Sequence, residues 1–230
     1  MTERPSATLV AREETAQGLF VLRLKVEDGQ LTQAHQHPGQ YVRLAIETLG
    51  ASLFALTSVP SDSSRVFEFL VRPGSLLADA LIEIPLGASV RIEGPFGEGF
   101  PLHLAEDKNV VLFATGTGIG AIRPVIELIC RDRSRYREVT LFYGVRTPGS
   151  IAYQEMLPLW TSAGIRTVLT VSQPGTSGWQ GLVGYVQDHL AEVKIERGIA
   201  FLSGQDQMIS EVKAQLLQRG MNLRDIHLNF

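Results

Sequence analysis

The stretch VVLFATGTGIGAIRPVIELI, Val110–Ile129, places Gly116, Gly118 and Gly120 within five positions. A short apolar run, a cluster of glycines and then spaced apolar residues predict a strand, a tight turn and a helix, the first half of a βαβ unit. Backbone N–H groups at a helix N-terminus lack intrahelical acceptors, and with the positive end of the helix dipole they favour an anion. Glycine also lets a phosphate approach the backbone closely. We therefore expect this turn to bind a phosphate group.

Composition limits the classes of protein to which the chain can belong. Its 230 residues, 44% apolar and 20% charged, are typical of a globular protein with one large core or two modest ones. The net charge of −3 gives no electrostatic case for binding nucleic acid or an anionic membrane. Because Cys130 is the only cysteine, an intrachain disulfide and a four-cysteine iron–sulfur cluster are excluded, so any redox cofactor is organic or haem.

The N-terminal stretch MTERPSATLVAREET has no apolar signal core, and no segment of the chain approaches the length of a membrane span. We therefore expect a cytoplasmic protein.

The pattern of the sequence changes near residue 105. Before this point short β-rich runs alternate with turn residues, which predicts an antiparallel barrel or sandwich; the runs are GLFVLRLKV, GQYVRLAI, LFALTSV, VFEFLVR and ASVRIEG. After it, candidate helices separate the apolar strands NVVLFAT, VTLFYGV, RTVLTVS, GIAFLSG and DIHLNF, which predicts a doubly wound parallel sheet. The sequence therefore predicts a β-domain over residues 1–105 and an α/β domain over residues 106–230, joined near Leu104–Lys108.

The Gly-rich turn follows the first strand of the second domain, where open parallel sheets bind ligands beyond the carboxyl ends of their strands. A nucleotide is the expected ligand. The turn lacks the full G-x-G-x-x-G spacing, and the second strand ends in YGVR, which offers Arg146 where an acid often binds a ribose. From the turn alone, glycines needed only for close helix–sheet packing are the alternative.

The order of motifs along the chain carries a family resemblance. HPGQYVRL, GPFGEGF, GTGIGAI, YGVR, SGQDQM and a terminal aromatic residue follow one another. This order, over nearly the whole chain, resembles the ferredoxin–NADP reductase superfamily, and most closely its small stand-alone FAD/NAD(P)-binding oxidoreductases of the plant and cyanobacterial type. The resemblance implies FAD in a Greek-key antiparallel β-barrel, NADH or NADPH on the parallel sheet, and electron transfer between them.

The resemblance also implies the flavin contacts. In the family an Arg-x-Tyr-Ser motif holds the flavin; here SLFALTS places Ser52 at the arginine, Phe54 at the tyrosine and Ala55 at the serine. Phe54 retains a ring that can stack on the flavin, whereas the arginine that grips the pyrophosphate is missing. Arg72 can supply a substitute charge, so we expect FAD to be bound, and weakly. The implied FAD contacts are Phe54, Ala55, Leu56, Thr57, Ser58, Leu70, Val71, Arg72, Gly74 and Ser75.

In the second domain the resemblance implies the nicotinamide contacts. The family's Gly-Thr-Gly-Ile is present, and Ser203 replaces the cysteine of its Cys-Gly-x-x-x-Met motif near the nicotinamide C4. Ser203 is therefore expected to act in catalysis. So is Phe230, which would cover the flavin until nicotinamide displaces it; the alternative is a core residue at the sheet edge. The implied nucleotide contacts are Gly116, Thr117, Gly118, Ile119, Tyr143, Gly144, Arg146, Gln173, Gly204, Gln205 and Met208.

Coenzyme choice stays open between NADH and NADPH, with a lean to NADH. The family's Ser-Arg pair after the third strand is Ser172-Gln173 here, and Arg146 or Arg123 can substitute as the cation for a 2′-phosphate. His35 and His37 have no evident third ligand, so no metal site is predicted. The basic run RDRSRYR, residues 131–137, is typical of a solvated helix end, with docking of an acidic ferredoxin or flavodoxin as the alternative.

The sequence thus predicts an oxidoreductase that transfers hydride from NAD(P)H to flavin N5 and passes the electrons to an acceptor. A ferredoxin, a flavodoxin, a quinone and a redox subunit of a larger complex are all compatible as that acceptor. The alternative function is a nucleotide-sensing or partner-docking protein that keeps the fold and has lost catalysis.

Overall fold

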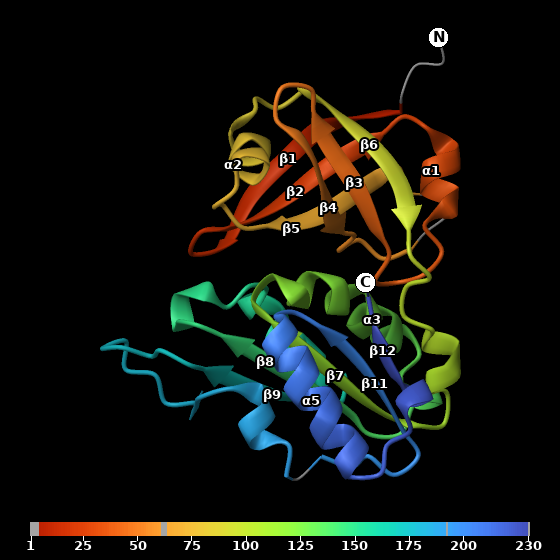
Figure 1. Cartoon of the computed structure of the whole chain (residues 1–230), viewed down its shortest axis with the longest axis vertical. Helices are drawn as coiled ribbons and strands as arrows, with labels where there is room; N and C mark the ends of the chain where they lie inside the picture. The colour runs from red at the N-terminus through yellow and green to blue at the C-terminus, as the bar shows by residue number, and fades with distance from the viewer. Residues whose placement is uncertain (1–4, 61–63, 192, 230) are drawn as a thin grey trace.

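The computed structural model describes residues 5–60, 64–191 and 193–229, which form two domains, one above the other in Figure 1. The first domain is a six-stranded antiparallel sheet with the strand order β4-β3-β6-β1-β2-β5. Its strands are β1 (Ser6–Ala16), β2 (Leu19–Val26), β3 (Tyr41–Ile46), β4 (Gly50–Ala55), β5 (Val66–Val71) and β6 (Ser89–Phe96).

The antiparallel sheet curls until its two outer strands meet. The N–H of Thr57, just beyond β4, donates to the Glu68 carbonyl on β5 at 2.9 Å. Alternate side chains of the strands point inward, so that Leu22, Leu24 and Phe69 are fully buried in the barrel core. Helices α1 (Gly29–Ala34) and α2 (Leu76–Glu83) pack apolar residues on this core.

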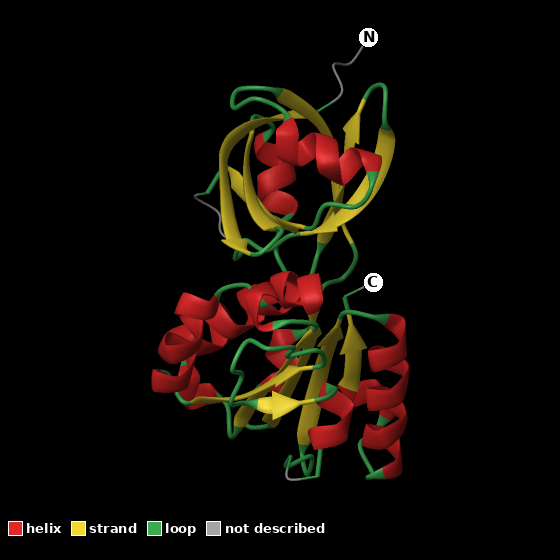
Figure 2. Ribbon diagram, turned by 90° about the vertical axis from the view of Figure 1, so that its left-hand side faces the viewer, coloured by secondary structure: helices red, strands yellow, loops and turns green. Residues whose placement is uncertain are grey.

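The second domain is a six-stranded parallel sheet with the order β10-β9-β8-β7-β11-β12. Helices cover both of its faces (Figure 2), with α3 and α4 packed on one face and α5 on the other. The strands are β7 (Asn109–Thr115), β8 (Val139–Val145), β9 (Ile165–Val171), β10 (Leu182–Val183), β11 (Gly198–Ser203) and β12 (Ile226–Leu228). The helices are α3 (Ile119–Arg131), α4 (Leu157–Ser162) and α5 (Asp206–Gln218).

Short 3₁₀ turns connect these elements: η1 (Leu102–Ala105), η2 (Gly116–Gly118), η3 (Arg133–Arg135), η4 (Pro148–Ser150), η5 (Gln154–Met156), η6 (Val186–His189) and η7 (Leu223–Asp225). Among the described residues, no helix is long and apolar enough to cross a membrane.

The two domains share one hydrophobic core. Leu19, Val21 and Leu70 of the barrel belong to the same buried cluster as the apolar face of α3. Gly120 allows this close approach, because a Cβ there would lie 2.7 Å from Thr57 Cγ2 and 3.1 Å from Leu70 Cβ. The barrel strand β5 and the helix that follows the Gly-rich turn are therefore in direct contact.

The predicted two-domain fold, a β-barrel followed by a parallel α/β sheet, is confirmed. Two strands of the barrel differ from their sequence expectation. β1 was not predicted, because the charged residues on its exposed side hide the period-two pattern of buried Ala7 and Leu9. The predicted strand LFALTSV stops at Ala55, since the chain then crosses to β5 through the Thr57 hydrogen bond and closes the barrel. The boundary between residues 105 and 106 stays a prediction.

Candidate functional site

The candidate site lies at the switch point of the parallel sheet. From β7 the chain runs outward through β8, β9 and β10, and then returns to place β11 and β12 on the other side of β7. The Gly-rich turn, η2, leaves the carboxyl end of β7, and Ser203-Gly204 leaves that of β11. Because ligands of such sheets bind where the strand order reverses, the two motifs flank the expected nucleotide site.

Two glycines hold these strand ends close together. A Cβ at Gly118 would lie 2.3 Å from the Ser203 carbonyl oxygen, and one at Gly204 would lie 2.0 Å from Thr115 Oγ1. The same hydroxyl accepts the N–H of Gln205 at 2.9 Å. Gly204 also has a φ of +148°, a conformation that side chains disfavour. Gly118 therefore serves close helix–strand packing, so this glycine is needed inside the protein even before a phosphate is considered.

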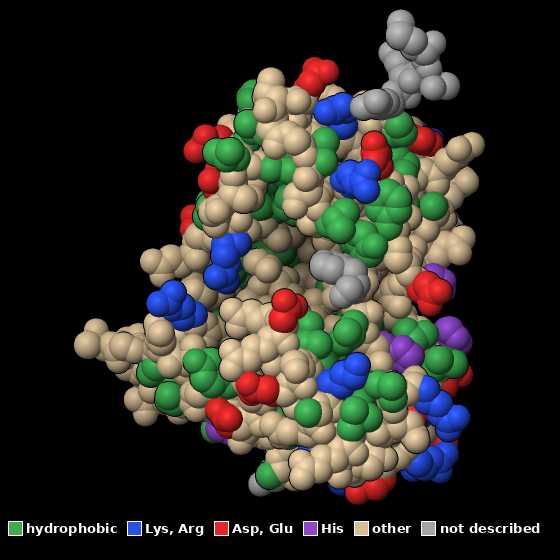
Figure 3. All heavy atoms as spheres, viewed as in Figure 1, with side chains coloured by type: hydrophobic (Ala, Val, Ile, Leu, Met, Phe, Trp, Pro, Cys, Tyr) green, Lys and Arg blue, Asp and Glu red, His purple; other side chains and the backbone are tan. Residues whose placement is uncertain are grey.

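Arg72 connects the barrel to the Gly-rich turn. It follows β5 and is exposed. Its Nη2 atom lies 3.3 Å from the point where a Cβ of Gly116 would sit. The surface is hollowed between the two domains (Figure 3). A guanidinium from the first domain therefore stands beside the helix N-terminus of the second, which suits a site that binds phosphates of either cofactor.

Phe54 is the aromatic residue of the predicted flavin motif. It lies near the end of β4, is partly buried, and meets Phe69 edge to face with ring centroids 6.5 Å apart. Ser52, at the position of the family's arginine, is exposed on the same strand opposite Leu44. The structure thus has the aromatic ring of Phe54 on β4, whereas Ser52 provides no positive charge at the position of the family's arginine.

The second predicted flavin motif carries a carboxylate that sequence reasoning missed. Ser75 caps α2, its hydroxyl accepting the N–H of Ala78 at 3.2 Å, and Asp79 Oδ1 accepts the N–H of Gly74 at 2.7 Å. A negative charge at this turn opposes a phosphate there. The signal was present in the sequence as an acid four residues after the Ser75 cap.

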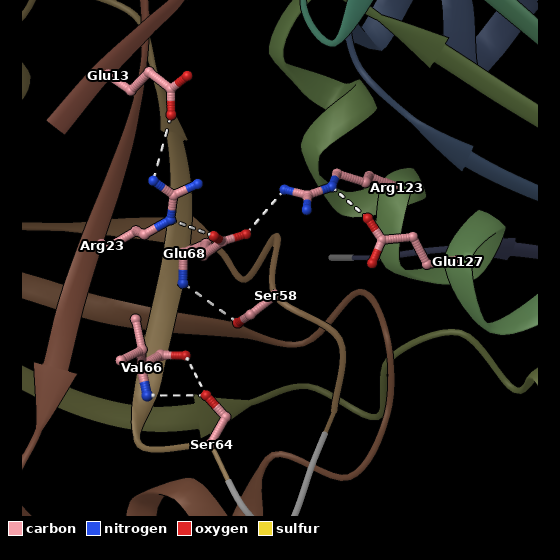
Figure 4. Close-up of polar contacts among 8 residues, drawn as sticks. All are labelled: Glu13, Arg23, Ser58, Ser64, Val66, Glu68, Arg123 and Glu127. Carbon is pink, nitrogen blue, oxygen red and sulfur yellow. Dashed lines mark hydrogen bonds and ion pairs between the residues drawn. The ribbon is translucent and has the colours of Figure 1, made fainter. Parts of the chain in front are cut away.

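An ion-pair network of Arg23, Glu68, Arg123 and Glu127, here called the Glu68 network, joins the two domains (Figure 4). Glu68 of β5 accepts Arg23 Nε at 2.6 Å and Arg123 Nη1 of α3 at 2.9 Å, and Arg123 Nε also reaches Glu127 at 2.6 Å. The Arg123 guanidinium carbon lies 4.8 Å from the centroid of the Tyr153 ring. Burial alone would lower the pKa of Arg123, but Tyr153, Glu127 and Glu68 raise it above its usual value. Arg123 is thus paired at the domain interface and does not serve as the cation for a 2′-phosphate.

Several predicted contacts are buried and support the site from beneath. The Tyr143 side chain is fully buried and its hydroxyl accepts the N–H of Ala152 at 3.1 Å. Burial raises the pKa of this hydroxyl. The Thr57 hydroxyl is buried next to the Tyr153 hydroxyl. The other buried members are Leu56, Leu70, Val71, Ile119, Gly144, Ser203 and Met208. Thr117 lies in the Gly-rich turn, and Gly204 and Gln205 directly follow β11. Phe230 lies outside the described residues.

Arg146 and Gln173 come together at the carboxyl ends of β8 and β9. Arg146 Nε donates to Gln173 Oε1 at 2.8 Å, and the Gln173 N–H donates to the Arg146 carbonyl at 2.7 Å. The structure therefore places a guanidinium on the nucleotide side of the sheet, at the end of the strand next to the one that leads into the Gly-rich turn.

The remaining sequence features are structural. His35 is buried against Phe67, and burial lowers its pKa to about 4. In the ranges that the structure describes, no group of histidine, cysteine, aspartate and glutamate side chains can hold a metal ion. In the basic run, Arg135 pairs with Glu106 and Arg137 with Asp107, so much of its charge is compensated at the surface.

Comparison with known proteins finds similarity to NAD-binding oxidoreductases. Residues 112–214 match the family model of the oxidoreductase NAD-binding domain. Fruit protein pKIWI502 of Actinidia deliciosa is 31% identical over 207 residues, which cover 82% of this chain and 64% of that protein. Sulfhydrogenase 2 subunit gamma of Pyrococcus furiosus is 26% identical over 205 residues, which cover 83% of this chain and 70% of that subunit. The chain thus spans about two thirds of the length of these curated relatives.

Solved structures share the fold over the whole chain. The cytochrome P450 reductase GcoB of Amycolatopsis superposes with a TM-score of 0.84 at 23% identity and covers 99% of this chain and 69% of its own. A ferredoxin NADP⁺ reductase from Neisseria gonorrhoeae, solved with bound FAD and NADP, gives a TM-score of 0.82 at 15% identity and covers 100% of both chains. These structures show the fold, and the NAD-binding domain match supports an oxidoreductase role. The chain therefore carries a region that matches the oxidoreductase NAD-binding domain, and it has the two-domain fold of the ferredoxin–NADP reductase-like proteins.

Proposed function

We propose that the protein is an FAD-dependent oxidoreductase that takes hydride from NADH or NADPH and passes electrons to a separate acceptor. The observation that carries the proposal is the meeting of Arg72 with the Gly-rich turn. Arg72 of the flavin-side motif and Gly116, the first glycine of the nucleotide-side motif, come from different domains, yet Arg72 Nη2 lies 3.3 Å from the Cβ position of Gly116. A site for two phosphate-bearing cofactors needs this juxtaposition.

The residues present fit FAD at the barrel. Phe54 would face the isoalloxazine ring and Arg72 would hold the pyrophosphate, while Thr57 lies against Gly120 of α3. When bound, FAD supplies the hydride-accepting chemistry. The protein positions the ring, excludes water through the shared core, and presents the nucleotide on the carboxyl ends of β7 and β11.

The test is the visible spectrum of the purified protein and its response to reduced nucleotide. We expect flavin absorbance, from added FAD where it is not retained, and anaerobic bleaching by NADH or NADPH. Arg72→Ala is expected to weaken FAD binding about tenfold or more, because a charge-assisted hydrogen bond contributes about 1.5 to 3 kcal/mol. Arg166→Ala, at the amino end of β9 and so at the edge of the sheet opposite the carboxyl ends of the strands, is the matched control. Equal FAD affinity in the Arg72 and Arg166 variants would place the pyrophosphate elsewhere.

For the coenzyme we keep the lean to NADH and propose Arg146 as the cation that a 2′-phosphate would meet. Its guanidinium is exposed and bonded to a neutral amide, Gln173, so it keeps its charge available. Arg146→Ala should raise the Michaelis constant for NADPH and leave that for NADH unchanged. A matched rise for both coenzymes argues for a role in binding the shared part of the nucleotide.

One pair of observations favours the second candidate, a nucleotide-sensing protein without flavin chemistry. Ser52 removes the family's phosphate-binding arginine, and Asp79 sets a negative charge on the turn that faces the phosphates. On this hypothesis the protein binds NAD(H) with high affinity, and its visible spectrum shows no bound flavin after excess FAD has been added and the unbound FAD removed. The same spectrum therefore separates the two functions.

A further inference from the structure

A second cleft crosses the boundary between the domains beside β12. It has a volume of about 570 Å³, and three of the chain's five histidines line it: His37, His103 and His227. Figure 3 shows histidine side chains gathered at the right-hand edge of the molecule, at the level where the domains meet. We call it the histidine cleft; its other lining residues are Tyr41, Gly97, Glu98, Gly99, Pro101, Leu104, Leu228 and Asn229.

Each wall of the histidine cleft adjoins one of the two predicted cofactor sites. Tyr41 of β3 lies directly opposite Ala55, the last residue of the flavin strand β4. On the other wall Leu228 of β12 lies opposite Leu202 of β11, one residue before Ser203. Neighbouring strands are about 4.8 Å apart. The cleft is therefore one strand away from both the flavin strand and the nicotinamide strand.

The chemistry of the lining favours a neutral ligand that accepts hydrogen bonds. Glu98 is its single charged side chain apart from the histidines, and neither lysine nor arginine lines it within the described part of the chain. His227 Nε2 and Asn229 Nδ2 are buried without a hydrogen-bond partner among the described residues, and Asn229 is 7% exposed. Burial lowers the pKa of His227, which keeps its imidazole neutral near pH 7. Neutral donors beside aromatic and aliphatic side chains suit carbonyl oxygens on a ring better than a phosphate or carboxylate.

The walls are held rigidly. Gln40 accepts the His37 N–H through Oε1 at 3.1 Å and donates through Nε2 to the Gly97 carbonyl at 3.1 Å. Gly99 has no room for a side chain, since a Cβ there would lie 2.6 Å from the Pro38 carbonyl oxygen. The barrel side of the cleft is thus preorganised, which lowers the entropic cost of binding.

We infer that the histidine cleft binds a small quinone, which serves as the electron acceptor of this protein. The inference rests on the proposed function for its source of electrons. The overall step balances: NAD(P)H and one proton from solvent reduce the quinone, whose two carbonyl oxygens each gain one O–H bond, giving NAD(P)⁺ and the quinol. His227 and Asn229 would donate to the ring's carbonyl oxygens, while Tyr41 and Leu228 contact its faces.

The test uses duroquinone, a fully substituted benzoquinone, added to the oxidised, FAD-loaded protein without nucleotide. In spectra of protein labelled at the histidine Cε1 carbons, the signals of His37, His103 and His227 should shift saturably. His189, in η6, is the internal reference and should stay in place. Unmoved signals from the three cleft histidines would overturn the inference, and so would an equal shift produced by inorganic phosphate, which would make the cleft an anion site.

Variants separate binding from catalysis. His227→Phe keeps a ring and removes a donor, and Asn229→Leu removes the other; each should weaken duroquinone binding about fivefold, the value of one neutral hydrogen bond. His189→Phe is the matched control and should bind as the parent protein does. With NAD(P)H present, His227→Phe should raise the Michaelis constant for duroquinone while the rate of flavin bleaching stays unchanged. If NAD(P)H bleaches the flavin but quinone binding is the same in all three variants, the quinone site in the cleft is refuted and the proposed function stands. If the histidine signals shift but NAD(P)H never bleaches the flavin, the proposed function fails, and the acceptor role of the quinone fails with it.

Discussion

Replacing Glu68 with glutamine tests whether the Glu68 network sets the position of the two domains. In the parent protein its carboxylate accepts one hydrogen bond from Arg23 at 2.6 Å and one from Arg123 at 2.9 Å. The glutamine amide offers a single oxygen, so its NH₂ group must face one of the two guanidinium groups. Glu68→Gln therefore removes one charge-assisted hydrogen bond and the attraction of a full negative charge.

The expected magnitude follows from the exposure of the groups. A hydrogen bond to a charged group contributes about 1.5 to 3 kcal/mol. The Glu68 and Arg123 side chains are 16% and 18% exposed, so solvent screens their interaction only in part, whereas Arg23 is 36% exposed. We expect Glu68→Gln to lower the free energy of unfolding by about 2 kcal/mol, or the melting temperature by about 4 to 8 °C for a chain of this size.

Glu13→Gln is the matched control, because Glu13 pairs with the same Arg23 at 3.4 Å but is 65% exposed. It should change the free energy of unfolding by less than about 0.5 kcal/mol. Calorimetric or urea unfolding of the three proteins provides the comparison. In the flavin-loaded protein, Glu68→Gln should also slow flavin bleaching by NAD(P)H without changing nucleotide affinity, since α3 keeps its packing on its own sheet. A Glu68 variant as stable and as fast as the Glu13 variant would refute the assignment of the network to domain positioning.

Three further outcomes follow from the site and the core. Gly118→Ala brings a Cβ to 2.3 Å from the Ser203 carbonyl oxygen, so it should lower the free energy of unfolding by about 1 to 3 kcal/mol and weaken nucleotide binding. Gly29→Ala is the control for both measurements, because its Cβ would find its nearest atom at 4.0 Å. Asp79→Asn removes the negative charge at the α2 turn and should tighten FAD about fivefold in a fluorescence titration, whereas a weaker complex would mean that the carboxylate mainly orders the turn. His35 has a pKa of about 4 when folded and about 6.5 when unfolded. The unfolded chain therefore binds more protons between these values, and stability should fall by up to about 3 kcal/mol as the pH drops from about 6.5 to about 4. His35→Phe, which keeps the contact with Phe67, should flatten this part of the unfolding-versus-pH curve, and an unchanged slope would show that another group titrates.

The paired arginines change the reading of the basic run at residues 131–137. In the sequence these residues are an uncompensated cluster, and an acidic redox protein is a reasonable partner for them. In the structure Glu106 and Asp107, from the connection before β7, lie against Arg135 and Arg137. Ion pairs between residues about 30 positions apart depend on how the chain returns at the end of β7, which a local pattern does not contain.

The sequence by itself determined the two kinds of sheet and the place of the nucleotide turn. Both are local properties: period-two alternation marks barrel strands, continuous apolar runs such as Asn109–Thr115 mark buried parallel strands, and glycines mark the turn between β7 and α3. β7, β8 and β11 match their predicted runs within one residue for that reason. The motif Ser203-Gly204 was likewise visible, since it directly follows such a run.

Only the tertiary structure decided what those motifs touch. Gly118 reads in the sequence as a phosphate-binding glycine, but its lack of a side chain is required by the Ser203 carbonyl 85 residues further along the chain. Arg123 is a second case: its sequence position suggests a cation for the coenzyme, but in the structure it binds Glu68 of the other domain. A third case is the group of histidines that three separate segments bring to one cleft, His37, His103 and His227. Contacts of this kind arise from strand order and from the packing of one domain on the other, so side chains that are distant in the sequence acquire a shared role only when the chain folds.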